Sequence, residues 1–361
     1  MVRLNTLSIL ACLLASGLLA SPAGAQTLAG DPADQIIGAD FTPLALDIGG
    51  RVVETSFAKT VADTQFGGPA YEHQWPGVYF AAAFHGSEVD FKLEDAANHY
   101  DVLVDGTLAG QVSKPGNAEY QISGLADSDH VVRLEKTSES QAATWQFDGF
   151  FIPPGEGALP APLQSRQIEF IGDSYTVGSG NISTSHACTP DQLWATTDTA
   201  KAFAPQVARH YDAEYRINAY SGRGVVRNYD GVVPEAPLPV LYPYALFDGK
   251  SEAMAAEWHP QVILIALGTN DFSTPVHAGE KWADLATLRA DYIVSYVAFI
   301  QKLREYNPAA QILLMAYDDP EVTADIEEVA TEVRANGDTR VDTIDAAGPL
   351  AKTGCDGHPS T

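Results

Sequence analysis

A strand that ends in a serine is the feature that most limits what this chain can fold into. The run Ile168–Ile171 is rich in β-branched and aromatic residues, and Gly172, Asp173 and Ser174 follow it. This pattern predicts a buried strand that carries Ser174 at its carboxyl end, the edge of an open α/β sheet where ligands bind. A serine becomes a nucleophile when a base takes its proton and hydrogen-bond donors receive the developing oxyanion.

Length and composition indicate a globular protein with two domains. The chain has 361 residues, of which 45% are hydrophobic and 19% are charged, and this is enough for two separate cores. The formal net charge is −26, because 47 Asp and Glu outnumber 21 Lys and Arg. Phosphate binding needs clustered Lys and Arg, so this charge argues against nucleic acids and anionic membranes as partners.

The first 25 residues have the pattern of a signal peptide. Arg3 supplies a positive charge, Leu7–Leu19 is apolar, and Ala23-Gly24-Ala25 is a small-x-small cleavage site. The apolar run is too short for a membrane-spanning helix, and no later stretch is long enough. We therefore expect cleavage after Ala25 and a secreted or periplasmic protein.

Residues 26–152 are predicted to form a β-sandwich domain of jelly-roll type. Residues 26–40 at its start show no clear period and are expected to be a loose leader. Short apolar or alternating runs recur between turn residues, without a helical period, at Gly77–Phe84, Val89–Leu93, Tyr100–Val104, Val131–Lys136 and Trp145–Phe151. We expect Trp75, Tyr79 and Trp145 in the core. The pattern does not distinguish a sugar-binding sandwich from a structural one.

A linker over residues 153–164 separates this domain from a second one over residues 165–361. Four prolines and two glycines lie between Pro153 and Pro162, a composition that favours neither a strand ladder nor a helix. Beyond it, apolar strands alternate with helices, which predicts a three-layer α/β/α domain with a parallel sheet. We expect further strands at 214–220, 261–267, 311–317 and 340–344, and helices at 201–211, 282–306 and 320–335.

The predicted strand ends bring together the groups that acyl transfer requires. Ser174 follows the first strand, Gly222 the second and Asn270 the third, and His358 lies near the end of the chain. The backbone N–H groups of Ser174 and Gly222 and the side-chain amide of Asn270 can stabilise an oxyanion, and a histidine can act as the base. Each group alone is weak evidence, but their order and their positions at strand ends argue against coincidence.

These blocks resemble the SGNH, or GDSL-type, hydrolase superfamily. The residues that carry the resemblance are Gly172-Asp173-Ser174, Gly222, Gly268-Thr269-Asn270-Asp271 and His358. The longer runs 220–229, 267–273 and 354–360 resemble one branch, carbohydrate esterase family two, whose N-terminal domain is a jelly roll. The resemblance covers nearly all of the mature chain. It implies a flavodoxin-like catalytic domain in an exported esterase that removes O-acetyl groups from plant-type polysaccharides such as xylan or glucomannan.

The resemblance also implies a role for each site residue. Ser174 is the nucleophile and His358 the general base, while Ser174, Gly222 and Asn270 form the oxyanion hole. The partner is an acetylated oligo- or polysaccharide, with no metal and no organic cofactor. The superfamily usually has two residues between its final Asp and His, whereas only Gly357 separates Asp356 from His358 here. Either Asp356 orients His358 as a third catalytic residue, or a backbone carbonyl does so and leaves a Ser–His dyad.

A second departure concerns the end of the sequence, which lies three residues after His358 where the family typically continues into a helix. The sequence is either truncated or carries its base on a tail that needs anchoring. Cys188 and Cys355 are the cysteines beyond the signal peptide, and in an oxidising compartment they form a disulfide or stay as free buried thiols. We expect the disulfide, because it would anchor the residues around His358.

Other classes of function remain open at this point. The fold also suits a catalytically decayed carbohydrate-binding protein, or a lipase or thioesterase with an apolar groove. A zinc-dependent deacetylase is disfavoured, because no His and Asp pair and no Cys pair has the spacing of zinc ligands. The sequence leaves open the polysaccharide, the hydroxyl that is deacetylated and the oligomeric state.

Overall fold

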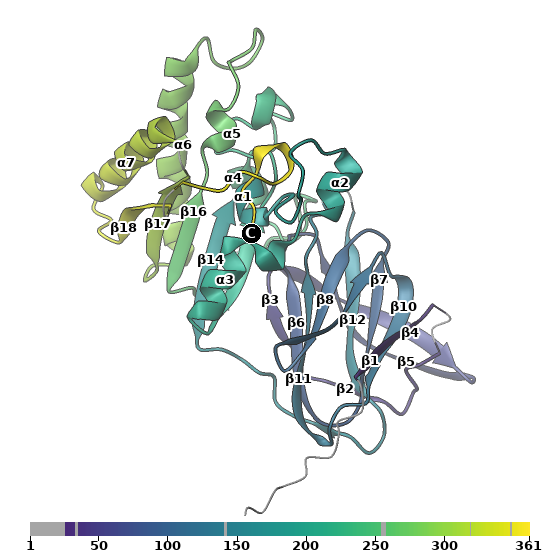
Figure 1. Cartoon of the computed structure of the whole chain (residues 1–361). Helices are drawn as coiled ribbons and strands as arrows, with labels where there is room; N and C mark the ends of the chain where they lie inside the picture. Colours follow the sequence, from purple (N-terminus) through teal and green to yellow (C-terminus); the bar gives the residue numbers. More distant parts are fainter. Residues whose placement is uncertain (1–25, 33–34, 141–142, 254–257, 318, 347–348) are drawn as a thin grey trace, which may run out of the picture.

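The computed structural model describes residues 26–32, 35–140, 143–253, 258–317, 319–346 and 349–361. They form an antiparallel β-sandwich followed by an α/β domain with a parallel sheet (Figure 1). The predicted fold class is therefore confirmed. The predicted signal peptide, residues 1–25, lies outside the described residues.

Two antiparallel sheets face each other in the sandwich. The first has the order β1-β10-β7-β12-β5-β4 with β2 paired to β12, and the second has the order β13-β6-β11-β8-β9 with β3 paired to β6. Along β8 every second residue is buried, as expected for strands with one face toward a core. The bounds are β1 (Thr27–Asp31), β2 (Thr42–Pro43), β3 (Asp47–Gly49), β4 (Val52–Val61), β5 (Thr64–His73), β6 (Tyr79–Gly86), β7 (Val89–Asp95), β8 (His99–Val104), β9 (Thr107–Ser113), β10 (Gly116–Ser123), β11 (Ser128–Lys136), β12 (Trp145–Ile152) and β13 (Gly157–Ala158).

Two segments that were not expected to form strands pair with the sandwich. Residues 27–31, predicted as part of a loose leader, form β1 and pair with β10. Within the predicted linker, Gly157 and Ala158 form β13 and pair with His85 and Phe84 of β6. Proline lacks a backbone N–H, but these two residues lie between the prolines and keep theirs. The linker is therefore held against the sandwich.

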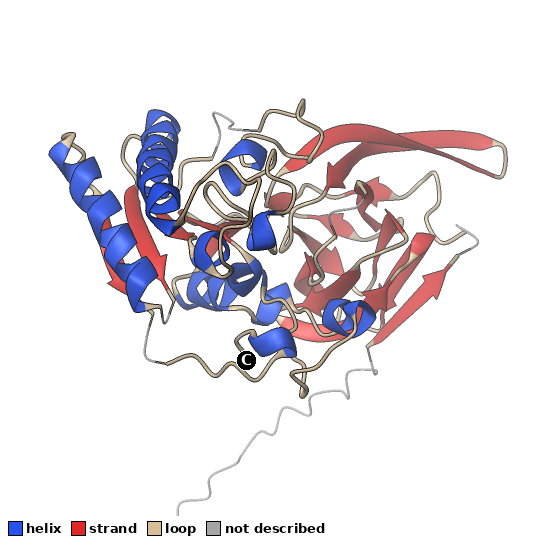
Figure 2. Cartoon of the chain, turned by 90° about the horizontal axis from the view of Figure 1, so that it is seen from above, coloured by secondary structure: helices blue, strands red, loops and turns tan. Residues whose placement is uncertain are grey.

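The second domain is built on a five-stranded parallel sheet. Its strand order is β15-β14-β16-β17-β18, the flavodoxin-like order in which the first strand lies beside the second and third. The bounds are β14 (Arg166–Gly172), β15 (Ala213–Ala219), β16 (Val262–Ala266), β17 (Gln311–Ala316) and β18 (Val341–Asp345). Seen from above, helices gather around this sheet, whereas strands dominate the other half of the molecule (Figure 2).

Helices cover both faces of the parallel sheet. Ala204 and Ala208 of α3 pack with Phe170 of β14 on one face, and residues of α6 and α7 pack with Ile263 and Ile265 of β16 on the other. The bounds are α1 (Ser174–Val177), α2 (Pro190–Ala195), α3 (Phe203–His210), α4 (Leu238–Leu241), α5 (Thr269–Phe272), α6 (Leu285–Tyr306) and α7 (Pro320–Ala335), with 3₁₀ turns η1 (Thr199–Lys201), η2 (Tyr229–Gly231) and η3 (Cys355–Gly357). No helix in the described ranges combines the length and the apolarity needed to cross a bilayer.

The start of α6 differs from the predicted start at residue 282. Asp284 accepts a hydrogen bond from the backbone N–H of Thr287, and the Thr287 side chain accepts one from the backbone N–H of Asp284. This capping box fixes the first helical residue at Leu285. The helix predicted at 320–335 has the bounds of α7.

The sandwich and the α/β domain share a buried interface. Arg51 of the sandwich is 4% exposed, donates a hydrogen bond to the carbonyl of Tyr242 and lies 3.3 Å from the carboxylate of Glu169. The indole N–H of Trp75 donates to the carbonyl of Tyr244 at 2.9 Å. One apolar cluster extends from the sandwich core to α6 and α7. These contacts fix one end of the sandwich against the second domain.

Candidate active site

Strand β14 carries Ser174 to the carboxyl edge of the parallel sheet. The strand ends at Gly172, and α1 begins at Ser174. Asp173 caps this short helix, because its side chain accepts a hydrogen bond from the backbone N–H of Tyr175 at 3.0 Å. Ser174 is 8% exposed. Ser174 is therefore mostly buried at the carboxyl edge of the sheet.

His358 contacts Ser174 and is oriented by the backbone. Its Nε2 lies 2.8 Å from Ser174 Oγ, and its Nδ1 lies 2.8 Å from the carbonyl oxygen of Cys355. A carbonyl can only accept, so Nδ1 carries the proton in the neutral ring. Nε2 is then the acceptor for the Ser174 hydroxyl, which is the arrangement that a general base requires.

Asp356, the other candidate for orienting His358, does not lie in that position. Its side chain is exposed, and its backbone has a φ of +53° and donates to the carbonyl of His186 at 2.7 Å. Both Asp356 and His358 are described, and the structure records no hydrogen bond between them. The geometry thus favours the alternative in which a backbone carbonyl orients the histidine.

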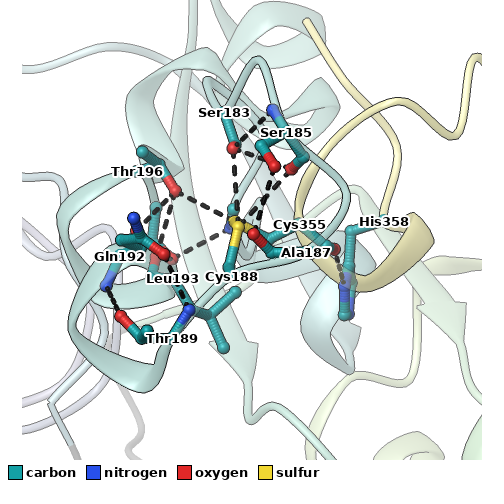
Figure 3. The surroundings of a disulfide bond; sticks show 12 residues. Ser183, Ser185, Ala187, Cys188, Thr189, Gln192, Leu193, Thr196, Cys355 and His358 are labelled. Carbon is teal, nitrogen blue, oxygen red and sulfur yellow. Dashed lines mark hydrogen bonds between the residues drawn. A yellow bond between two sulfur atoms is a disulfide. The ribbon is translucent and has the colours of Figure 1, made fainter.

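A disulfide joins Cys188 to Cys355 directly beside this histidine (Figure 3). The two cysteines are 167 positions apart in the sequence. The same segment is also held by backbone hydrogen bonds from Cys355 to the carbonyl of Gly180 at 3.3 Å and from Thr361 to the carbonyl of Asn181 at 3.1 Å. The carbonyl that accepts the hydrogen bond from His358 Nδ1 therefore belongs to Cys355, a residue that the disulfide anchors.

Two backbone N–H groups in the site are available as donors. The N–H of Ser221 donates to Glu139 at 2.8 Å, and that of Arg223 donates to the carbonyl of Tyr220 at 3.1 Å. For the N–H groups of Gly222, which lies between them, and of Ser174, no acceptor is recorded among the described residues. Gly222 has a φ of +78°, a conformation that a residue with a side chain adopts only with strain.

The side chain of Asn270 connects the first two blocks of the site. Its amide nitrogen is 2.9 Å from the carbonyl of Arg223 and 3.2 Å from the carboxylate of Asp173. An amide nitrogen has two hydrogens, so both have acceptors in this structure. Donation to an oxyanion requires one of them to be shared or redirected.

Asp271 fixes the loop that carries Gly222. Its carboxylate accepts hydrogen bonds from the backbone N–H groups of Val225, Val226 and Arg227, at 2.9 to 3.0 Å. Burial raises the pKa of Asp271 to about 6, although these hydrogen bonds act in the opposite direction. Gly224 makes this contact possible, because a Cβ there would lie 2.4 Å from the Asp271 carboxylate.

Asp173, which precedes Ser174 in the Gly172-Asp173-Ser174 motif, is fully buried near Asp271. Burial raises the pKa of Asp173 to about 7; the hydrogen bond from the Tyr175 N–H acts in the opposite direction, and the nearby charges of Asp271 and Glu139 add to the rise. Asp173 and Asp271 belong to motifs recognised in the sequence, but the sequence assigned neither residue a role. The structure makes both of them supports for the strand-end loops.

Glu139 is a site neighbour that sequence reasoning missed. It lies in the loop between β11 and β12 of the sandwich and accepts the hydrogen bond from Ser221, next to Gly222. No motif surrounds it, and the contact spans 82 sequence positions. The sandwich therefore contributes directly to the loop that presents Gly222. Among the described residues, no group of three or more His, Cys, Asp or Glu is placed to hold a metal ion.

Comparison with known proteins agrees with this geometry. A family model described as "Carbohydrate esterase 2 N-terminal" matches residues 64–162, and one described as "GDSL-like Lipase/Acylhydrolase family" matches residues 170–360. A relative named acetylxylan esterase / glucomannan deacetylase, from Cellvibrio japonicus (strain Ueda107), is 41% identical over 328 residues, which are 90% of this chain and 89% of the relative.

Solved structures extend the comparison. One, of a carbohydrate esterase whose active site displays divergent catalytic and non-catalytic binding functions, is 40% identical, with a TM-score of 0.80 over 88% of this chain and 93% of that chain. Another, of a family two carbohydrate esterase from Clostridium thermocellum in complex with cellohexaose, is 28% identical, with a TM-score of 0.71 over the same shares.

The fold and the relatives together define a carbohydrate esterase of the SGNH type. The predicted resemblance and the predicted enzyme class are both confirmed. Within this class, the chain belongs to carbohydrate esterase family two.

Proposed function

We propose that this protein is an exported serine esterase that removes O-acetyl groups from polysaccharide sugars of the xylan or glucomannan type. The observation that carries the proposal is the 2.8 Å contact between Ser174 Oγ and His358 Nε2 at the carboxyl edge of the sheet. The name of the Cellvibrio japonicus relative, acetylxylan esterase / glucomannan deacetylase, supports the choice of substrate.

In the first step, His358 Nε2 takes the hydroxyl proton of Ser174 as Oγ attacks the acetyl carbonyl. The negative charge on the carbonyl oxygen is received by the N–H groups of Ser174 and Gly222 and by the Asn270 amide. The bond to the sugar oxygen then breaks, and the imidazolium of His358 returns the proton to the leaving hydroxyl. The product of this step is an acetyl ester on Ser174.

In the second step, water takes the place of the sugar. His358 removes a proton from the water, which attacks the acetyl group on Ser174, and the same donors receive the charge. Collapse of this intermediate frees acetate, and the proton returns to Ser174 Oγ. Throughout, the Cys355 carbonyl keeps the Nδ1 proton of His358 in place, which is the orienting role that a carboxylate has in a triad.

Export is part of the proposal and rests on the sequence. The positive, apolar and small-residue regions of residues 1–25 have the order of a signal peptide with cleavage after Ala25. Polysaccharides are extracellular substrates, so a secreted or periplasmic enzyme would meet them. A disulfide beside the base also suits an oxidising compartment.

The test measures acetate release from acetylated xylan, acetylated glucomannan and 4-nitrophenyl acetate. Wild type is compared with Ser174→Ala and with Ser56→Ala, a control on the exposed face of β4. We expect activity on the polysaccharides that is lost in Ser174→Ala and kept in Ser56→Ala, with circular dichroism unchanged. A wild type that binds these polysaccharides but releases no acetate would instead support a non-catalytic sugar-binding protein. Preference for long acyl esters over acetyl esters would support a lipase or thioesterase.

A further inference from the structure

A cavity separate from the catalytic dyad lies between the loops that follow β15 and β16. Residues 225–240 form one wall and residues 277–282 the other, with Ser295 of α6 between them. We call this cavity the side groove. Its volume is about 830 Å³, within the roughly 300–1,000 Å³ of typical ligand pockets. Neither Ser174 nor His358 lines it.

The side groove is continuous with the loops that carry Gly222 and Asn270. The backbone N–H of Tyr229 donates to the carbonyl of Gly222 at 2.9 Å, and the next residue, Asp230, lines the groove. Arg227 lines it as well and donates to the carbonyl of Asp271, one residue beyond Asn270, at 3.2 Å. Tyr229, which is 52% exposed, lies on this loop between Gly222 and Asp230 in the sequence.

The charges of the side groove suit a neutral ligand rather than an anion. Each basic side chain that lines it lies beside a carboxylate: Arg227 beside Glu280 at 2.6 Å, His277 beside Asp230 at 2.6 Å and Lys281 beside Asp291 at 2.8 Å. Glu235 adds an exposed carboxylate. These carboxylates provide acceptors for hydroxyl hydrogens, and the lining Arg227 and Lys281 already have carboxylate partners, which disfavours a phosphate or a sulfate as the ligand.

Trp282 contributes an aromatic side chain to the lining of the groove, and the Lys281 ammonium lies over its ring, 5.6 Å from the centroid. Its ring is half-buried, and its indole N–H donates to Asp291 at 2.9 Å, so the ring is held in one orientation. Val226 and Val240 add apolar surface. A fixed aromatic ring with nearby hydrogen-bond acceptors matches the surface of a sugar, which alternates C–H faces with hydroxyl groups.

We propose that the side groove binds sugar residues of the neutral polysaccharide backbone that flank the acetylated residue at Ser174, with Trp282 as the stacking platform. The inference rests on the proposed function, because its ligand is the same polymer. Binding there would hold the chain while successive acetyl groups are removed.

Binding is measured first, in the Ser174→Ala background, so that no turnover intervenes. The probes are unacetylated xylohexaose and mannohexaose, with affinity determined by calorimetry. We expect Trp282→Ala to weaken the binding of the preferred probe about tenfold or more. A second variant, Ala278→Arg, changes an exposed lining residue and should also weaken binding by filling the groove. The control is Tyr211→Ala, which removes an exposed aromatic ring outside the groove.

Kinetics in the active enzyme give the second measurement. Trp282→Ala should raise KM for acetylated polymer several-fold more than KM for 4-nitrophenyl acetate, which has no sugar chain to reach the groove. Affinities and KM ratios in Trp282→Ala and Ala278→Arg that equal those of Tyr211→Ala would overturn the proposal. Failure of the proposed function looks different: the wild type would not deacetylate the polymer, or Ser174→Ala would retain activity.

Discussion

Breaking the disulfide between Cys188 and Cys355 should disable the active site before it unfolds the protein. The bond anchors the residue whose carbonyl orients His358. When it is lost, the segment around His358 can separate from the body of the domain while the sheets persist. We therefore expect reduction to lower kcat for 4-nitrophenyl acetate more than tenfold at a temperature where the circular dichroism signal of the sheets is intact.

The magnitude follows from the two kinds of restraint on this segment. The bond links positions 167 apart, and the chain-entropy relation gives a stabilisation of up to about 5 kcal/mol for a loop of this length. Hydrogen bonds also connect the segment to the domain, from Cys355 to Gly180, from Asp356 to His186 and from Thr361 to Asn181. The chain-entropy figure applies to unfolding of the whole chain; in the folded but reduced chain, the segment depends on these three hydrogen bonds, at about 1 kcal/mol each.

The assay compares the oxidised enzyme, the enzyme reduced with dithiothreitol, and the double variant Cys188→Ser/Cys355→Ser. The double variant should resemble the reduced enzyme and should not respond to dithiothreitol, which controls for other effects of the reagent. Thermal unfolding should show a lower midpoint for both disulfide-free forms. Equal kcat with and without the disulfide would refute the reasoning that this bond keeps His358 in place.

Three further predictions concern the residues that support the site. Glu139→Ala should lower kcat about fivefold, because it removes one hydrogen bond of about 1 kcal/mol to the loop that carries Gly222. Glu139→Gln keeps an acceptor and should therefore recover most of kcat. Equal kcat values for the two variants would contradict a positioning role for Glu139. Asp271→Asn should lower the free energy of unfolding by about 1–3 kcal/mol in urea titrations, because a charged acceptor of three backbone N–H groups becomes neutral. An unchanged urea midpoint would contradict this supporting role of Asp271. Burial raises the pKa of Asp173 from 3.8 to about 7, so the folded chain keeps a proton that the unfolded chain releases. The free energy of unfolding should therefore fall as pH rises from about 4 to about 7, and Asp173→Asn should reduce this slope in denaturation measured across that range; identical slopes would contradict the assignment.

The central strands of the α/β domain could be predicted from the sequence because most of their residues are buried on both faces of the sheet. The run at 261–267 is almost fully apolar, and the structure places β16 at Val262–Ala266 within it. Strand β1 was missed because its residues are mostly exposed and therefore show no apolar alternation. Strand β13 has two residues between prolines and depends on pairing with β6, which local sequence does not reveal.

Part of the candidate site could also be predicted. Ser174 and His358 follow from motifs, since their side-chain chemistry and their spacing are visible in the sequence. The group that orients His358 was left open, because every residue has a carbonyl and only the backbone path selects that of Cys355. Glu139 could not be found, because its contact with Ser221 depends on how the two domains pack.

The central claim is that Ser174 carries the acetyl group during turnover, and trapping that intermediate tests it most directly. The enzyme is mixed with 4-nitrophenyl acetate, quenched in acid and analysed by mass spectrometry of the intact chain and of its peptides. We predict the mass of one added acetyl group on the peptide that contains Ser174, and no acetylation of that peptide in Ser174→Ala. Active enzyme whose acetyl group is found on another residue, or on none, would contradict the account.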